Sequence, residues 1–378
     1  MRGRCKGSVL SDRHPLEPLG YGPRWQALFE EQAAALADQY SGEHLLCGRV
    51  VRVDRGSVLV TTESATLRAA PSARLAKAVA RAALPVTGDW VVVAAPPDLD
   101  IPLIEAVLER ATAFTRGDPD KTSEQQVLAA NVDTVFVLHS VSKLPNLRRI
   151  ERELAAAWES GATPVVVLAK SDLSDDPAAD LAAVETVAPG VDVHVTSAVS
   201  DEGVEALRGY GRGHRTIALI GPSGVGKSTL VNALIGEERQ ATREVRLSDG
   251  KGRHTTVSRE LFVMPGGGVL LDTPGMRALA MTDRGEGIEA AFPDVDALAQ
   301  ECRFRDCGHT NEPGCAVLRA VGDGALPAAR LASYHKLQAE VRVAAAKTDV
   351  RLRADEAKKG KTLSKNIRQY YRITGKEE

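Results

Sequence analysis

One segment restricts the fold of this chain more than any other. The sequence GPSGVGKST follows a strand-like run at residues 217–220 and opens a helical pattern over Lys227–Ile235. Its G-x-x-x-x-G-K-[ST] spacing, between a strand and a helix, is typical of a phosphate-binding loop. Glycines let backbone N–H groups surround phosphate oxygens, and the helix N-terminus adds a positive partial charge. A plain glycine turn is the alternative, and the strand–loop–helix context argues against it.

Each position of this loop has an expected contact with a nucleotide. Lys227 is expected to reach the β- and γ-phosphates and to act in catalysis, while the Ser228 hydroxyl is expected to hold Mg²⁺. The loop residues expected to bind nucleotide are Gly221, Pro222, Ser223, Gly224, Val225, Gly226, Lys227, Ser228 and Thr229.

A second motif lies downstream of the loop. The apolar run 269–271 ends in Asp272-Thr273-Pro274-Gly275, which fits the pattern D-x-x-G. We expect Asp272 to reach Mg²⁺ and the Gly275 N–H to sense the γ-phosphate. The motif is weak alone, and its place after a phosphate-binding loop strengthens it.

The polar segment between these two motifs, residues 237–259, is expected to be a switch loop, with an ordinary surface loop as the alternative. One of its threonines, Thr255 with Thr256 as the other choice, would complete the Mg²⁺ shell when γ-phosphate is present.

A base-reading motif precedes the phosphate-binding loop. Ala169-Lys170-Ser171-Asp172 ends a strand-like run and fits Asn-Lys-x-Asp with alanine in the first position. The Asp172 carboxylate would accept hydrogen bonds from guanine N1–H and the exocyclic amine, which adenine does not offer. The Lys170 stem would pack along the base. Because Ala169 lacks the side-chain amide that usually ties this loop to the phosphate-binding loop, we expect weaker nucleotide affinity.

A second base contact is expected from Ser197 and Ala198, which close another strand as the guanine O6-binding Ser-Ala motif does. Each base motif is common by chance. Their joint occurrence at strand ends, in a chain with the two phosphate motifs, favours GTP and GDP as ligands.

The order of the motifs is unusual. A standard GTPase has the phosphate-binding loop first and the base motifs last, whereas this chain has the base motifs first. Such a circular permutation preserves the fold, because the termini of a domain often lie close together.

The residues that promote hydrolysis are less clearly marked. Met276 follows the D-x-x-G motif, where many GTPases place a glutamine that orients the attacking water. His254, beside the switch threonines, is the nearest candidate, with a solvated loop histidine as the alternative. With Lys227 and Thr255 it completes the expected catalytic set. Intrinsic turnover should be slow until a partner completes the site.

Near the C-terminus, Cys302, Cys307, His309 and Cys315 offer three thiolates and an imidazole. This is the Cys₃His set of tetrahedral zinc sites. Because four protein ligands leave no open position, we expect one structural zinc per chain. Unrelated buried cysteines are the alternative. The total of five cysteines is odd, and three of them lie in this short segment with the histidine, which is a metal pattern rather than a disulfide framework and suits a reducing cytoplasm.

Periodicity divides the chain into four parts. Five strand-like runs predict an OB-type barrel, although any small β domain is the alternative; they are 47–53, 57–62, 65–68, 90–94 and 101–108. Helices are predicted at 24–40, within the alanine-rich insert 71–84, at 147–160 with a charged outer face, and at 326–347. Strands at 132–141, 164–170, 191–197 and 216–220 alternate with helices and indicate a mostly parallel sheet.

We therefore expect a multi-domain chain with an N-terminal extension, an all-β OB-type RNA-binding barrel, a circularly permuted α/β P-loop GTPase domain, and an α-helical zinc-binding domain with a basic tail. The expected bounds are 1–42, 43–112, 113–291 and 292–378.

Together these features resemble the bacterial ribosome-small-subunit-dependent GTPase A family (RsgA). The resemblance rests on GPSGVGKSTL, GRHTT, DTPG, NLRRIERELAAAWESG and the Cys/His cluster, within residues 43–340. It implies a late assembly factor that binds the small ribosomal subunit and its rRNA and hydrolyses GTP when bound. It also implies that His254 matches a histidine associated with activated hydrolysis. Ala169, the alanine-rich insert and the long N-terminal arm depart from the family pattern.

Charge and hydropathy narrow the partners. The net charge of −2 gives no global attraction to nucleic acid, so RNA binding would need a local patch. The tail from 357 to 376 is basic and contains Tyr370-Tyr371, although such runs are more often solvated. The first twenty residues contain no apolar run, and no apolar run is long enough to span a membrane, so we expect a cytoplasmic protein without membrane contact. We also expect it to be a monomer.

Two other functions fit parts of the sequence. A GTP-dependent metal chaperone should keep the ordinary motif order and an open metal site. An RNA-binding module with a weak nucleotide site should not need an intact Lys227, Ser228 and Asp272.

Overall fold

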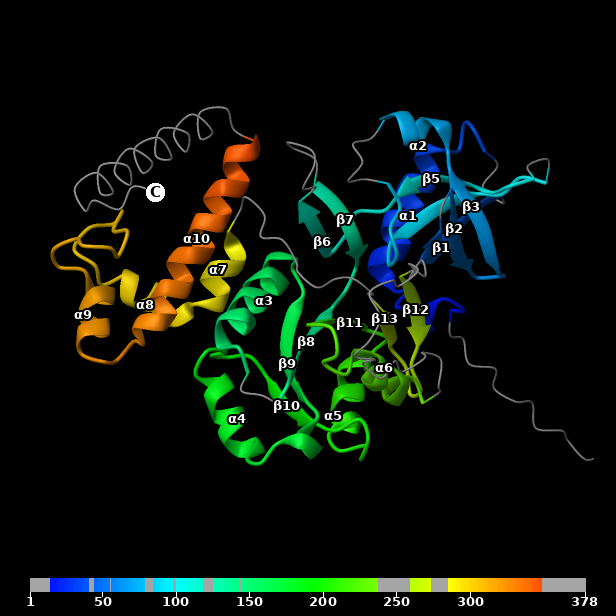
Figure 1. Cartoon of the computed structure of the whole chain (residues 1–378). Helices are drawn as coiled ribbons and strands as arrows, with labels where there is room; N and C mark the ends of the chain where they lie inside the picture. Colours follow the sequence, from blue (N-terminus) through cyan, green and yellow to red (C-terminus); the bar gives the residue numbers. More distant parts are fainter. Residues whose placement is uncertain are drawn as a thin grey trace, which may run out of the picture.

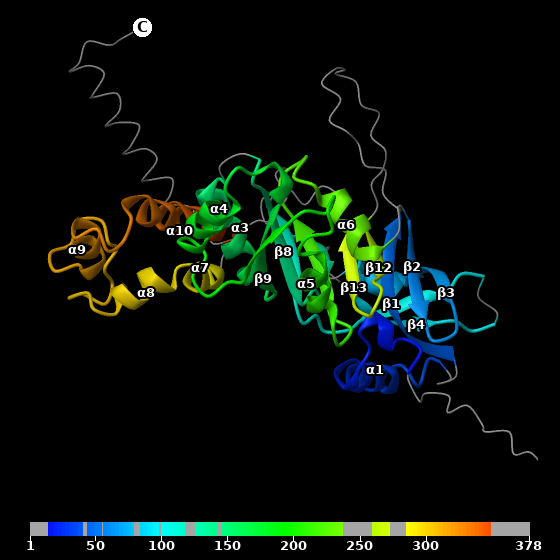
Figure 2. The ribbon, with the colours of Figure 1, turned by 90° about the horizontal axis from the view of Figure 1, so that it is seen from below.

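The computed structural model places three bodies in a row, with the α/β domain between the barrel and the helical domain (Figures 1 and 2). Within the part of the chain that the structure describes, no helix is long and apolar enough to cross a membrane. The described residues are 14–40, 44–54, 56–78, 84–97, 100–117, 125–142, 145–236, 259–272 and 285–348.

Five strands form the N-terminal barrel: β1 (Leu45–Asp54), β2 (Ser57–Thr62), β3 (Thr66–Pro71), β4 (Trp90–Ala94) and β5 (Leu103–Val107). β1 pairs with both β2 and β4, and β3 pairs with β5, so the order β1-β2-β3-β5-β4 closes on itself. Inward-facing Val50, Val60, Val91 and Ile104 fill the interior. The prediction of an OB-type barrel is confirmed. The described part of the alanine-rich insert contains helix α2 (Ala73–Ala78).

The central sheet has the order β10-β9-β8-β11-β13-β12, with parallel neighbours except for the antiparallel β12. Its strands are β8 (Thr134–Ser140), β9 (Thr163–Ala169), β10 (Val193–Thr196), β11 (Thr216–Ile220), β12 (Glu260–Val263) and β13 (Val269–Asp272). The predicted mostly parallel sheet is confirmed. β12 also pairs with β1, so the central sheet continues into the barrel.

Three strands of the structure were not expected from the sequence. β6 (Ala113–Gly117) and β7 (Gln125–Ala130) form a separate hairpin. Their sequences, AFTRG and QQVLAA, mix polar and small residues without a clear alternation, so they carry little strand signal. β12 is only four residues long and becomes a strand by pairing with β13 and β1.

Helices cover both faces of the central sheet. Apolar side chains of α3 (Leu147–Glu159) and α4 (Pro177–Glu185) pack on one face. Those of α5 (Val204–Arg208) and α6 (Lys227–Ile235) pack on the other. The carboxyl ends of the parallel strands lie together at one edge of this sheet, where ligand sites of such folds commonly lie.

The prediction that α3 presents a charged outer face is wrong for two of its glutamates. Glu151 and Glu153 are only 2% and 3% exposed. Glu153 contacts Arg149 and His139, each at 2.8 Å, and Glu151 accepts a hydrogen bond of 2.9 Å from Arg330. Buried carboxylates of this kind need such partners, since an unpaired buried charge is costly.

The C-terminal body consists of α7 (Glu286–Ala291), α8 (Pro293–Ala299), α9 (Ala316–Gly322) and α10 (Ala328–Thr348). Arg330 of α10 joins this body to α3, because it pairs with Glu151 and with Asp294 of α8. The Glu159 carboxylate of α3 accepts hydrogen bonds from the Gly285 and Gly287 N–H groups, which satisfies the N-terminus of α7.

Residues 14–40 pack against the barrel. They contain a short 3-10 helix η1 (Glu17–Leu19) and α1 (Pro23–Ala35), which ends before the expected residue 40. Trp25 of α1 stacks on Trp90 of β4, with ring centroids 5.7 Å apart. Buried Arg49 of β1 donates to the carbonyl of Leu19 and to Thr216 Oγ1 of β11, so one guanidinium connects this segment, the barrel and the central sheet.

Candidate functional site

The phosphate-binding loop begins where β11 ends. Gly221 has φ +146°, and a Cβ atom there would lie 2.5 Å from the Leu138 carbonyl oxygen, so the backbone path requires glycine. Lys227 opens α6, and its ammonium donates hydrogen bonds of 2.7 Å to the carbonyls of Gly221 and Pro222. The loop is thus curled around its own lysine at a helix N-terminus, an arrangement suited to a phosphate anion.

The base motif lies against this loop. Lys170 follows β9 in a left-handed conformation, with φ +66°. Its ammonium donates a 2.7 Å hydrogen bond to the carbonyl of Gly224. The lysine side chain therefore crosses to the phosphate-binding loop and ties the two motifs together, even though position 169 is alanine.

The Ser-Ala motif lies beside the base motif because β10 and β9 are parallel neighbours, with Thr196 opposite Ala169. The Ser197 hydroxyl, on a fully buried residue, donates a 2.6 Å hydrogen bond to Asp172 Oδ1. Asp172 itself is exposed. Ala198 packs on the apolar cluster around α5 and α6. The structure thus brings the two sequence-predicted base motifs into direct contact.

Sequence reasoning did not single out Glu202. Its carboxylate accepts a 2.9 Å hydrogen bond from the Ser171 hydroxyl, and its main-chain carbonyl accepts a 3.0 Å bond from the Ser197 N–H. None of the sequence motifs includes this residue, and its contacts depend on how the two loops pack together.

Asp272 lies at the same edge of the sheet as the phosphate-binding loop. β13 runs parallel to β11 with Leu271 opposite Ala218, so Asp272 follows beside the end of β11. The other expected phosphate and switch residues fall outside the described residues, in 237–258 and 273–284; they are His254, Thr255, Thr256, Gly275 and Met276.

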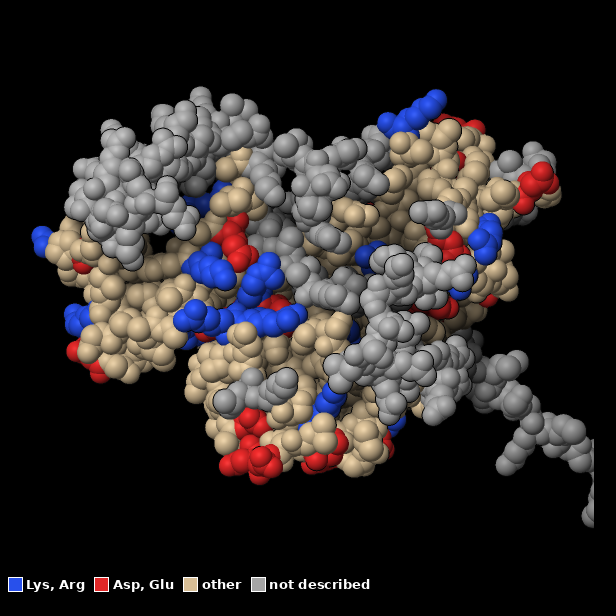
Figure 3. Space-filling model, in the orientation of Figure 1, with Lys and Arg blue, Asp and Glu red and all other residues tan. Residues whose placement is uncertain are grey.

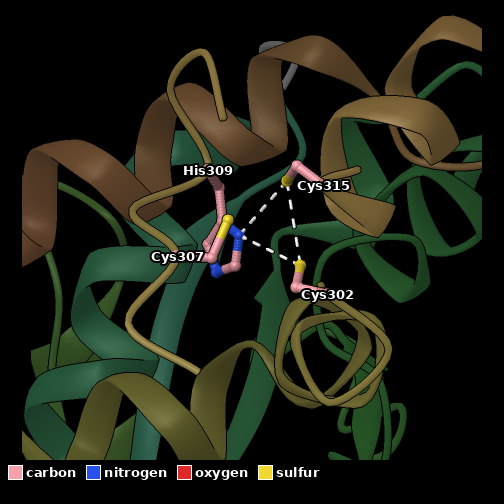
Figure 4. Close-up of side chains that lie close together, drawn as sticks. All are labelled: Cys302, Cys307, His309 and Cys315. Carbon is pink, nitrogen blue, oxygen red and sulfur yellow. Dashed lines mark hydrogen bonds between the residues drawn. The ribbon is translucent and has the colours of Figure 1, made fainter. Parts of the chain in front are cut away.

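The predicted metal ligands meet in the C-terminal body (Figure 4). The ligand atoms of Cys302, Cys307, His309 and Cys315 all lie within 4.8 Å of one another. The Cys302 sulfur is 3.8 Å from that of Cys315, and His309 Nδ1 is 3.7 Å and 3.4 Å from the same two sulfurs. These residues could hold one metal ion.

The protonation of two ligands favours metal binding. Burial opposes ionisation of the Cys302 thiol, but hydrogen bonds from the backbone N–H groups of Val317 and Ala316 and from the Cys315 and Cys307 thiols together lower its pKa. Burial also lowers the pKa of His309. A thiolate and a neutral imidazole are the forms that bind a metal ion.

Glu312 organises the loop that carries two of these ligands. Its carboxylate accepts hydrogen bonds from the N–H groups of Gly308, Thr310 and Asn311, at 2.9, 2.8 and 3.0 Å. These bonds lower its pKa to about 2. Sequence patterns do not mark this role, because a glutamate in a polar loop is usually solvated.

Comparisons with known proteins agree with this geometry. The family model described as RsgA GTPase matches residues 107–282. A model for ABC transporters matches residues 211–373; both matches contain the phosphate-binding loop, which many nucleotide hydrolases share.

Two curated relatives carry the name small ribosomal subunit biogenesis GTPase RsgA. The Streptomyces avermitilis protein is 47% identical over 353 residues, which is 92% of each chain. The Methanosarcina acetivorans protein is 44% identical over 292 residues, 77% of this chain and 79% of its own length.

Two solved structures have a similar fold. YjeQ from Thermotoga maritima matches with a TM-score of 0.59 and 26% identity, over 79% of this chain and 98% of its own. YloQ, described as a circularly permuted GTPase, matches with a TM-score of 0.57 over 80% of this chain and 97% of its own. At 22% identity, the similarity to YloQ shows a shared fold and nothing more.

Proposed function

This chain belongs to the RsgA GTPase family, and we propose that it binds the small ribosomal subunit and hydrolyses GTP there late in assembly. GTP hydrolysis follows from the family. The observation that best supports the nucleotide is the contact between motifs, in which Lys170 reaches the phosphate-binding loop and Ser197 reaches Asp172. The subunit is the partner named for the curated relatives, which match most of this chain. On this proposal the protein works in the cytoplasm, where subunits assemble.

For the phosphates, we assign Lys227 to the β- and γ-phosphate oxygens, and its present hydrogen bonds to Gly221 and Pro222 would be exchanged for them. Ser228 and Asp272 lie at one edge of the sheet, where both could hold the Mg²⁺ ion that accompanies GTP. Thr255 is the remaining candidate ligand. The ion would neutralise phosphate charge as it develops during hydrolysis.

For the base, we assign Asp172 to guanine N1–H and the exocyclic amine. One oxygen of its carboxylate is already held by Ser197, which fixes the direction of the other. A carboxylate positioned in this way rejects adenine, because adenine presents an acceptor at N1 and no amine at C2. The Ala198 backbone and the Lys170 stem complete the base site.

We propose that the metal ion of the C-terminal body is zinc. A tetrahedron with zinc–sulfur bonds of about 2.3 Å has sulfur–sulfur edges of about 3.8 Å, and the Cys302–Cys315 sulfur separation is 3.8 Å. His309 and Cys315 are buried, and four protein ligands leave no open coordination position. The ion would therefore hold the loop and helices together. An exchangeable site, as a metal chaperone needs, does not fit this ligand set.

Replacing one ligand tests the zinc site. Cys307→Ser should lower the zinc content from about one ion per chain and lower the melting temperature, because structural zinc contributes directly to folding free energy. Metal analysis and calorimetry of the purified protein provide the measurement. Cys47→Ala, which removes a buried thiol from the barrel, should leave the zinc content unchanged. Equal zinc and equal melting in Cys307→Ser would contradict the assignment.

A basic surface supports contact with RNA. Figure 3 shows Lys and Arg side chains gathered where α3, α7 and α10 meet, and acidic side chains near α4. Exposed cations on α3 and α10 include Arg148, Lys336 and Arg342. Contacts of such cations with RNA phosphates release counterions, so binding to the subunit should weaken as salt rises.

Subunit binding itself can be measured by co-sedimentation of the full chain with purified small subunits. We expect more protein in the pellet with a non-hydrolysable GTP analogue than with GDP, and less at high salt. Absence of the protein from the pellet under every nucleotide condition would contradict the proposed partner.

His254 is the proposed group that orients the attacking water, because Met276 cannot do so. Docking on the subunit would bring His254 to the γ-phosphate, where correct orientation accelerates the reaction. His254→Ala should therefore lose most of the stimulation by subunits in single-turnover assays while it still co-sediments with them. His194→Ala serves as a control, since His194 hydrogen-bonds to the Tyr210 hydroxyl and belongs to none of the nucleotide motifs. Undiminished stimulation of His254→Ala would exclude this role.

A further inference from the structure

One side chain outside every recognised motif joins the two loops that would read guanine. The Glu202 carboxylate accepts a 2.9 Å hydrogen bond from Ser171 Oγ, in the third position of the base motif. The Glu202 carbonyl accepts a 3.0 Å bond from the N–H of Ser197, in the Ser-Ala motif. A single residue thus contacts both loops, once through its side chain and once through its backbone.

These contacts lie immediately next to the atoms that would touch the base. Ser171 precedes Asp172, and Ser197 donates to the Asp172 carboxylate at 2.6 Å. Ser171 and Ser197 are 7% and 0% exposed, whereas Asp172 is exposed. Glu202 itself is exposed, and its contacts hold the two buried serines while the Asp172 carboxylate stays open to a ligand.

The backbone around Glu202 is fixed by tight geometry. Gly203 has φ +73°, and a Cβ atom there would lie 2.7 Å from the Val195 carbonyl oxygen of β10. Asp201 has φ +60°, a left-handed conformation that costs energy outside glycine. The turn consequently folds back closely on β10, which brings the Glu202 side chain to Ser171.

The alanine at the start of the base motif explains why such a link matters. Ala169 is buried at the end of β9 and has no polar side chain with which to fasten its loop. Lys170 fastens the base-motif loop to the phosphate-binding loop through the Gly224 carbonyl, which is the side of the base motif that faces the phosphate-binding loop. The Ser171–Glu202 bond fastens the opposite side, against the Ser-Ala loop.

We propose that Glu202 is a positioning residue for guanine recognition, which holds the base motif and the Ser-Ala motif at a fixed separation so that Asp172 meets both guanine donors. The proposal rests on the function proposed above. Glu202 does not touch the base. It restricts where the Asp172 carboxylate lies, as the supporting residues of a preorganised binding site do.

The test compares the dissociation constants of GDP, IDP and ADP for the full chain. IDP lacks the exocyclic amine, so the ratio of IDP to GDP dissociation constants reports how well Asp172 reaches that amine. Glu202→Ala should weaken GDP by about tenfold and IDP by less, because a displaced carboxylate loses a charge-assisted hydrogen bond that only GDP makes. The ratio should shrink by at least about threefold.

Companion variants separate positioning from folding. Ser171→Ala should reproduce the effect of Glu202→Ala. The double variant should bind no worse than either single variant, because the two substitutions remove the same hydrogen bond. Glu202→Gln keeps an oxygen acceptor for the Ser171 hydroxyl and should retain most of the preference for GDP over IDP. Glu205→Ala, close to the same turn, removes an exposed carboxylate that pairs with Arg208 and with neither base loop, and it should change nothing.

Two results would overturn the role of Glu202: unchanged binding of all three nucleotides by Glu202→Ala, or an equal loss for GDP and IDP with a lower melting temperature. The second result would mean a purely structural residue. Failure of the underlying function is distinguishable, since the parent chain would then bind GDP no better than ADP.

Discussion

Lys227→Ala is expected to reduce GTP turnover by at least about a hundredfold, since removal of one group that stabilises transition-state charge typically costs about two to three powers of ten. The lysine sits at the N-terminus of α6, with its ammonium inside the phosphate-binding loop. An alanine there offers no charge to the γ-phosphate. Release of radiolabelled phosphate, measured with and without small subunits, provides the rate.

The fold should survive this substitution. Packing of α6 on the sheet depends on its apolar face, which includes buried Leu230, Val231 and Leu234. Lys77→Ala removes an exposed lysine from α2 in the barrel and should leave turnover unchanged. Turnover near the parent value in Lys227→Ala would mean that GTP is hydrolysed at another site.

Asp172→Asn is expected to change the base preference of the site from guanine to xanthine. Two hydrogen bonds from guanine to a carboxylate would be lost or reversed, and bonds to charged groups contribute about 1.5–3 kcal/mol each. GTP affinity should therefore fall by about a hundredfold or more, since each 1.4 kcal/mol is about tenfold. Xanthosine triphosphate should bind more tightly than to the parent, because its C2 carbonyl accepts a bond from the new amide.

The measurement is competition between GTP and xanthosine triphosphate for the same protein. In Asp172→Asn the new side chain can still accept the Ser197 hydroxyl bond through its carbonyl oxygen, so the loops should keep their contact. Asp175→Asn, an exposed position in the same loop, provides a matched control. Unchanged affinity for both nucleotides in Asp172→Asn would show that the base motif has been misassigned.

Local sequence patterns predicted those helices and strands whose apolar residues face the core at the spacing of the element itself. The buried run at β11 and the loop-to-helix transition into α6 lie at the predicted residues. The same is true of β2 (SVLVTT), in which buried and half-buried residues alternate, and of β4 (WVVVA), which is buried throughout. β-Branched residues are enriched in strands of both kinds. The four metal ligands also meet as predicted, because their residue types have few other reasons to occur together.

Contacts between residues far apart in sequence could not be predicted in this way. Glu151 looks like a surface residue of an amphipathic helix until Arg330, 179 positions later, packs on it. Glu202 and Ser171 are 31 positions apart and meet only because β9 and β10 are neighbours. Glu312 accepts hydrogen bonds from backbone N–H groups of its own loop, and every residue type except proline offers such a group, so no sequence pattern marks the contact.

The most direct test of the proposed function is single-turnover GTP hydrolysis by the parent chain, alone and with purified small ribosomal subunits. Lys227→Ala gives the background, and large subunits control for nonspecific RNA. We expect small subunits to raise the rate at least about tenfold, equivalent to about 1.4 kcal/mol of activation barrier, while large subunits do not. The same rate with and without small subunits would contradict the proposed function.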